Sequence, residues 1–103
     1  MNKEAKVGII VAAGIAAENK APVIAEQLRD ALPNITLQLN CGGGNFKNQM
    51  KRADKSGAQL AIILGEDEIA RDEVTIKSLR DDGGQQTLAF VTACQWLKDY
   101  LKI

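Results

Sequence analysis

The chain has 103 residues, enough for one hydrophobic core and too few for two. Thirteen basic residues balance thirteen acidic ones, so a polyanion would have to be held by a local basic patch. Histidine is absent, which excludes the commonest general base, the usual metal ligand and every Ser-His or Cys-His nucleophile pair.

The N-terminal part and the cysteines indicate an intracellular protein. The apolar run at residues 7–13 is too short to span a bilayer, and no signal-peptide cleavage site follows it, so we expect a cytoplasmic location and no membrane partner. Cys41 and Cys94 lie outside any C-x-x-C arrangement. We expect two reduced cysteines, although the sequence leaves a disulfide open.

The first third of the chain predicts a strand followed by a helix. Val7–Ala12 has no polar side chain and is rich in β-branched residues, as in a strand that is buried on both faces of a parallel sheet. A helical pattern follows from about Asn19, which we interpret as the N-cap, and Pro33 ends it. The apolar positions at i, i+4 and i+8 of this helix are Ile24, Leu28 and Leu32.

The next segment predicts an edge strand and a second helix. Ile35–Asn40 alternates apolar and polar residues, which is typical of a half-covered strand toward a sheet edge. A glycine turn follows, Asn45 is the expected N-cap, and Gly57 is expected to end the helix. The predicted buried face of this helix consists of Phe46, Met50 and Ala53.

The last part predicts three strands and a final helix. Gln59–Leu64 is a third buried strand, and an acidic segment, residues 66–73, is expected to form a turn. Val74–Leu79 and Gln85–Phe90 are shorter strands, joined by a hairpin-type link. The last helix begins near Thr92, and its predicted inward residues are Ala93, Leu97, Tyr100 and Leu101. The predicted order is β-α-β-α-β-β-β-α, an α/β fold with a parallel sheet, right-handed crossovers and one antiparallel neighbour.

A phosphate-binding surface is predicted after the second strand. Ligands of open α/β sheets lie at the carboxyl ends of the strands, and the glycine turn there, with Gly43 and Gly44, lets a ligand approach the backbone. Lys47, Lys51 and Lys55 then share one helix face. Arg52 lies beside them, against a single acidic residue, Asp54. The alternatives are a plain tight turn and a solvated helix face.

The acidic residues that follow the third strand have three open interpretations. Glu66 and Glu68 are solvated turn residues, a weak cation site, or acceptors for base edges, since a carboxylate can accept from two donors of an unpaired guanine. A small nucleotide-dependent enzyme is disfavoured because neither G-x-x-x-x-G-K-[ST] nor G-x-G-x-x-G is present.

Three segments together carry a family resemblance. They are residues 42–49 (GGGNFKNQ), 52–58 (RADKSGA) and 64–68 (LGEDE). The sequence closely resembles the C-terminal anticodon-binding domain of bacterial histidyl-tRNA synthetase, which is shared by a subgroup of class II aminoacyl-tRNA synthetases. The similarity extends from the first strand to the last helix, although the segment before the last helix, residues 88–92, is short for the family.

The resemblance implies a fold and a set of RNA-binding residues. The fold is a three-layer α/β/α domain with a five-stranded mixed sheet of order 2-1-3-4-5, in which strand 4 is antiparallel. The histidine anticodon, GUG, would be recognised by the loops at the strand ends, and Glu66 would face an anticodon base. Lys51 is added because it follows Lys47 by one helical turn. The RNA-binding residues are then Gly43, Gly44, Asn45, Phe46, Lys47, Lys51 and Glu66.

The resemblance also implies what lies outside the sequence. The catalytic domain of the family is missing, so we expect one anticodon-binding domain, residues 1–103, from the C-terminal part of a larger synthetase. We expect no catalytic residues, no metal and no cofactor here, because ATP and Mg²⁺ would belong to the catalytic domain. The expected partners are the anticodon loop of tRNA and the catalytic domain of a parent synthetase that forms a homodimer. The alternative is a standalone paralogue that acts as a protein-interaction or general RNA-binding module.

Overall fold

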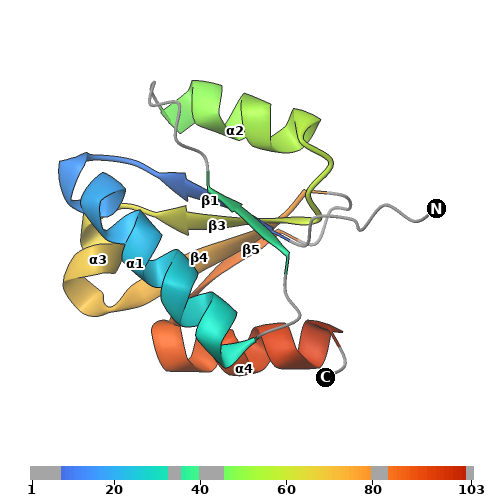
Figure 1. Cartoon of the computed structure of the whole chain (residues 1–103). Coiled ribbons are helices and arrows are strands. Elements are labelled where there is room, and N and C mark those ends of the chain that lie inside the picture. The colour runs from blue at the N-terminus through green and yellow to red at the C-terminus, as the bar shows by residue number, and fades with distance from the viewer. Residues whose placement is uncertain (1–7, 33–35, 40–45, 80–83, 102–103) are drawn as a thin grey trace.

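The structure is a computed structural model that describes residues 8–32, 36–39, 46–79 and 84–101 (Figure 1). Its centre is a mixed sheet with the strand order β2-β1-β3-β4-β5. β1 pairs in parallel with β2 and β3, and β4 is antiparallel to both β3 and β5. The expected order and the expected antiparallel strand 4 are therefore confirmed. The strands are β1 (Gly8–Ala12), β2 (Leu37–Leu39), β3 (Leu60–Leu64), β4 (Glu73–Ser78) and β5 (Gln85–Ala89).

Helices cover both faces of this sheet and complete the three layers. α2 covers one face, α1 and α4 cover the other, and α3 lies at the end of the sheet where β1 and β3 finish (Figure 1). The helices are α1 (Ile15–Ala31), α2 (Phe46–Lys55), α3 (Glu66–Arg71) and α4 (Phe90–Leu101).

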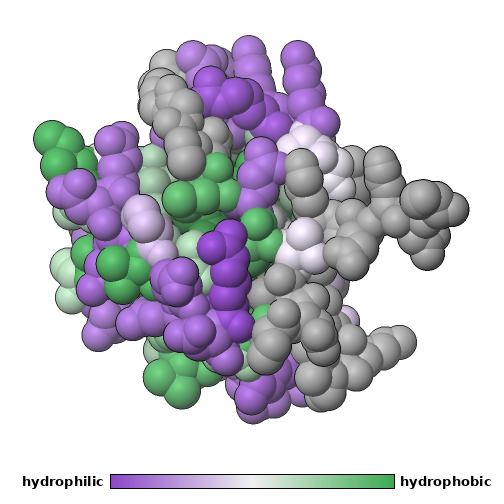
Figure 2. All heavy atoms as spheres, viewed as in Figure 1, coloured by the Kyte–Doolittle hydropathy of each residue, from purple (hydrophilic) through white to green (hydrophobic). Residues whose placement is uncertain are grey.

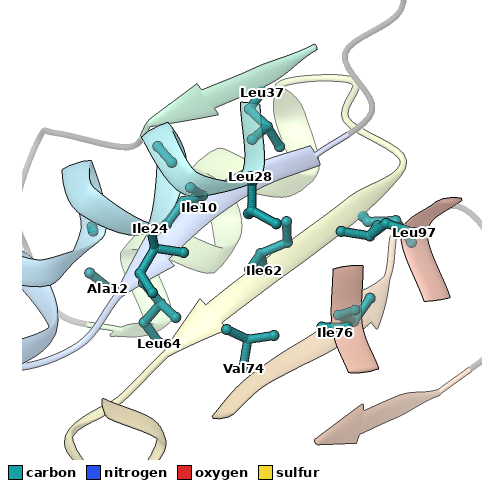
Figure 3. Packing of buried hydrophobic residues seen from close by; sticks show 14 of the residues in the cluster. Ile10, Ala12, Ile24, Leu28, Leu37, Ile62, Leu64, Val74, Ile76 and Leu97 are labelled. Carbon is teal, nitrogen blue, oxygen red and sulfur yellow. The ribbon is translucent and has the colours of Figure 1, made fainter. Parts of the chain in front are cut away.

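Two hydrophobic clusters lie on the two faces of the sheet. Alternate side chains of a strand point to opposite faces, so in β1 Ile10 and Ala12 join the larger cluster, whereas Ile9 and Val11 join the smaller one under α2. Every residue of β1 and β3 is buried, which confirms the prediction of strands covered on both faces. Figure 3 shows the larger cluster packed against α1 and α4; its labelled members are Ile10, Ala12, Ile24, Leu28, Leu37, Ile62, Leu64, Val74, Ile76 and Leu97.

α1 begins five residues earlier than the sequence predicts. Its N-cap is Gly14, and Asn19 is an exposed residue inside the helix. Gly14 has φ +97° and ψ 159°, a conformation that is essentially restricted to glycine and that turns the chain directly from β1 into the helix. The buried stripe accordingly begins at Ala17 rather than at Ile24.

α3 replaces a predicted turn. Glu66, Asp67 and Glu68 form its first turn, where negative charge is favoured by the positive end of the helix dipole. No residue of this helix is buried. Its sequence therefore lacks the apolar periodicity from which a helix is predicted. The observed order is β-α-β-α-β-α-β-β-α.

The predicted inward face of α2 is partly wrong. Phe46 is 44% exposed, and Gln49 takes the buried position instead, at 2% exposed. Ala53 is buried and Met50 half-buried, as expected, and Gly57, with φ +85°, follows the helix end as predicted.

The final helix begins at Phe90, two residues before the predicted start. Ala93 and Leu97 are buried as expected. Tyr100, predicted to face inward, is 41% exposed, because its ring stacks on Trp96 and its hydroxyl donates a 2.8 Å hydrogen bond to Gln59 Oε1. The side chain of Leu101 lies outside the described part of the structure.

The predicted ends of the strands shift by one or two residues, and Val7, Ile35 and Asn40 lie outside the described residues. The same holds for Cys41, while the thiol of Cys94 is free and half-buried. Among the residues that the structure describes, no helix is both long and apolar enough to cross a bilayer.

Candidate nucleic-acid interface

The candidate interface lies at the end of the sheet where β1 finishes. Gln49 of α2 hydrogen-bonds to the backbone of Ala12, and Glu66 of α3 lies against Gly14, two residues further on. The beginnings of α2 and α3 therefore meet the same end of β1, as Figure 1 also shows. This is the carboxyl end of the parallel strands, where ligands of open α/β sheets bind.

The predicted site residues divide into two groups. Gly43, Gly44 and Asn45 lie outside the described residues. The other four, Phe46, Lys47, Lys51 and Glu66, are all exposed and belong to α2 or to the first turn of α3.

A lysine stripe, defined here as Lys47, Lys51 and Lys55, runs along the outer face of α2. Residues two apart on a helix are separated by about 200°, so this stripe lies opposite the buried positions of Gln49 and Ala53. Hydrophilic side chains cover this helix in the space-filling view (Figure 2). The charges of the stripe are therefore available to an anion that lies over the helix.

Phe46 is the first residue of α2, directly before the first lysine of the stripe. Its exposed ring is unsuited to the core role that the helical pattern predicts. An exposed aromatic ring beside cationic side chains is suited to stacking against an unpaired base.

Glu66 begins α3 and is exposed, and its carboxylate lies over Gly14. A Cβ built on Gly14 would lie 2.7 Å from Glu66 Oε2, so glycine at this position makes room for the carboxylate. The carboxylate thus lies beside the end of β1, on a side chain that is exposed. Such a group can accept hydrogen bonds from a donor on a ligand.

Glu68 has a structural role instead. Its Oε1 accepts a 3.0 Å hydrogen bond from the backbone N–H of Gly65, the N-cap of α3, and its Oε2 accepts a 3.0 Å hydrogen bond from the hydroxyl of Thr75. A hydroxyl has a single proton, so the 2.8 Å bond between Thr75 and Thr87 must be donated by Thr87. Oε1 of Glu68 thus caps α3, and Oε2 ties the helix to β4, a structural role that the three interpretations from the sequence did not include.

In the part of the chain that the structure describes, no group of three or more Cys, Asp or Glu side chains is placed to hold a metal ion.

The chain matches the family described as "Anticodon binding domain" over residues 6–100, which is almost its whole length. It therefore belongs to the anticodon-binding domain family. The family resemblance inferred from the sequence is confirmed.

Solved structures of aminoacyl-tRNA synthetases share the fold. Apo histidyl-tRNA synthetase of S. aureus matches 93% of this chain, with 25% identity and a TM-score of 0.78. Histidyl-tRNA synthetase of Nostoc sp. PCC 7120 matches 93%, with 24% identity and a TM-score of 0.79, and the RNA-binding domain of threonyl-tRNA synthetase of Cryptosporidium parvum Iowa II matches 91%, with 11% identity and a TM-score of 0.82. The chain spans 24%, 23% and 23% of the S. aureus, Nostoc and Cryptosporidium chains respectively.

Proposed function

We propose that this chain binds the anticodon loop of a tRNA and that the tRNA is the one specific for histidine. Its family supports binding to the anticodon. The histidine assignment is supported by the GGGNFK and RADKSGA segments and by the 25% identity to the S. aureus histidyl-tRNA synthetase.

One observation carries the proposal: three kinds of side chain that suit an anticodon loop are exposed at one end of the sheet. Lys47 and Lys51 can hold phosphates, and Phe46 can stack on an unpaired base. Glu66 can accept from a base edge, for which guanine offers two adjacent donors. The segment that contains Gly43, Gly44 and Asn45 is included in the proposed site because it directly precedes Phe46 in the sequence.

The proposal extends to a parent protein. The chain is about a quarter as long as the synthetases that it resembles, so we infer that it is one domain of a cytoplasmic, homodimeric histidine–tRNA ligase. Binding of ATP, Mg²⁺ and histidine would then belong to the catalytic domain of that ligase. In this arrangement the present chain contributes recognition of tRNA and no catalytic group.

The experiment is a binding assay of the wild-type chain and the Glu66→Gln variant against a small panel of anticodon stem-loops. The wild type should prefer the GUG anticodon. Glu66→Gln keeps the shape of the side chain but replaces one acceptor with a donor, so it should lower the affinity for GUG by roughly 1–3 kcal/mol, as for a bidentate base contact.

The loss should largely vanish when the guanine that Glu66 contacts is replaced by adenine. Folding should change by no more than about 0.5 kcal/mol, because Glu66 is exposed. Equal losses for every anticodon would mean that Glu66 positions the loop without reading it. A wild-type chain that binds all stem-loops alike would contradict the proposed specificity.

A further inference from the structure

The backbone polar groups of Ala12, the last residue of β1, lie on the side of the strand away from β3. In the described residues, β2 pairs with β1 from Gly8 to Ile10, and β3 pairs with β1 from Gly8 to Ala12, which lies opposite Leu64. The next backbone N–H, that of Ala13, also turns toward β3 and donates to Leu64. In a strand the N–H and C=O of one residue point to the same side, so those of Ala12 point away from β3.

Gln49 of α2 supplies hydrogen-bonding partners for both backbone groups of Ala12. Its Oε1 accepts a 3.2 Å hydrogen bond from the N–H of Ala12, and its Nε2 donates a 2.7 Å hydrogen bond to the C=O of the same residue. The carboxamide of this helix residue thus pairs with both polar backbone groups of the last residue of β1. Gln49 is 2% exposed, so removing its carboxamide would leave the buried N–H and C=O of Ala12 without these two hydrogen bonds.

Apolar packing holds α2 only weakly. Its buried residues are Gln49 and Ala53, and Met50 adds a half-buried side chain to the cluster beneath the helix. The methyl group of Ala53 is too small to fix the rotation of α2 about its own axis. The two hydrogen bonds of Gln49 fix that rotation, and with it the direction in which the lysine stripe on the opposite face points.

We propose that Gln49 is the positioning residue of the RNA-binding surface: it locks α2 to the end of β1 so that Lys47 and Lys51 point toward the RNA phosphates. The inference rests on the proposed function, because it requires that the lysine stripe contacts RNA. Gln49 itself touches no RNA, since it is buried under the helix.

The first test is Gln49→Met, which keeps a long side chain but removes the hydrogen-bonding carboxamide. The variant should remain folded by circular dichroism and should bind the GUG stem-loop roughly threefold to tenfold more weakly, because phosphate contacts are lost. Ile76→Val is a matched control, since it trims the core on the face of the sheet away from α2 and should leave RNA affinity unchanged.

A double-mutant cycle then separates positioning from general destabilisation. In a Lys47→Ala/Lys51→Ala background, Gln49→Met should cause no further loss, because the groups that Gln49 positions are gone. Equal losses with and without the lysines would overturn the inference. Unchanged affinity of Gln49→Met, when the double lysine variant binds weakly, would overturn it and leave the proposed function intact. Unchanged affinity of the double lysine variant would overturn the phosphate-binding role of the stripe and, with it, the inference.

Gln49→Glu tests the inference even if Gln49→Met fails to fold. An ionised carboxylate cannot donate to the C=O of Ala12, whereas a protonated carboxyl group regains one donor and one acceptor. The affinity of this variant, as a ratio to the wild type at the same pH, should be low at neutral pH and recover as the pH falls. A ratio that does not depend on pH would overturn the inference.

Discussion

The carboxylate of Glu66, at the beginning of α3, occupies the space beside Gly14 that a side chain at that position would need. A Cβ on Gly14 would meet Oε2 of Glu66 at 2.7 Å and its Cγ at 3.0 Å. Because β1 and β3 pair in parallel with Ala12 opposite Leu64, the residues that follow the two strands are brought together. Gly14 is therefore the N-cap of α1, and its lack of a side chain also leaves room for the carboxylate of Glu66, the proposed base-reading group.

Gly14→Ala should destabilise the chain and displace Glu66. The φ and ψ of Gly14 are strained for any residue with a Cβ, so we expect a loss of about 1–3 kcal/mol in the free energy of unfolding, measured with urea. The displaced carboxylate should also lower the preference for the GUG anticodon.

The two effects of Gly14→Ala can be separated with a second substitution. In a Glu66→Ala background the added methyl group no longer meets the carboxylate, so the backbone strain should remain while the effect on anticodon preference disappears. An unchanged stability of Gly14→Ala in both backgrounds would contradict the strained conformation of this residue.

Glu68→Ala should lower stability and leave anticodon preference unchanged, which is the opposite of what we expect for Glu66→Gln. It removes the acceptor for Gly65 and for Thr75, and it should lower the free energy of unfolding by about 1–2 kcal/mol. Anticodon preference among the folded molecules should stay that of the wild type. Glu68→Gln should restore much of the stability, because an amide can still accept from Gly65; selective loss of GUG binding in Glu68→Ala would contradict the structural role of Glu68.

An element of the fold could be predicted from the sequence where the interactions that form it lie within a short segment of the chain. The strands β1 and β3 were predictable because their sequences contain uninterrupted apolar runs, and the lysine stripe because its spacing is that of a helix face. α3 was missed because it buries no residue and is held by Glu68 and Thr75, a contact that no periodicity records.

The geometry of the site depended on contacts between distant elements. A glutamine in an amphipathic helix normally indicates a solvated position, whereas Gln49 is buried and pairs with the backbone of Ala12, a residue 37 positions away in the sequence. The contact between Glu66 and Gly14 likewise follows from the register of β1 on β3. The sequence pattern predicted which residues lie near the carboxyl end of the sheet. It could not predict the contacts of Gln49 with Ala12 and of Glu66 with Gly14, because these join elements that are distant in the sequence.

Cys94 should react slowly with alkylating reagents at neutral pH. Burial raises the pKa of its thiol, and the positive charge of Lys98 opposes this only in part. In a Cys41→Ser background, alkylation by iodoacetamide should be slower in the folded chain than in urea and should accelerate as the pH rises. Lys98→Met should raise the pKa of Cys94 further and slow the reaction at a given pH; a faster reaction would contradict this arrangement.

The same pKa shift has a consequence for stability. The folded state holds the proton of Cys94 more tightly than the unfolded state, whose thiol titrates at about pH 9.0. The stabilising contribution is therefore complete below that pH and is lost as the pH rises through the folded-state pKa. Urea unfolding of the wild type and of Cys94→Ala should give stabilities whose difference shrinks with rising pH above this point.

The lysine stripe should contribute through phosphates rather than through bases. Lys47→Ala and Lys51→Ala should each weaken binding of every stem-loop to a similar degree, and each should reduce the slope of log affinity against log salt concentration by about 0.7, as for one contact to single-stranded RNA. Lys20→Ala is the matched control, because Lys20 is an exposed lysine of α1, which lies on the other face of the sheet. Its slope should equal that of the wild type. Binding and slope that are unchanged in Lys47→Ala/Lys51→Ala would show that the stripe is only a solvated helix face, and an equal effect of Lys20→Ala would show that the RNA responds to overall charge and not to this surface.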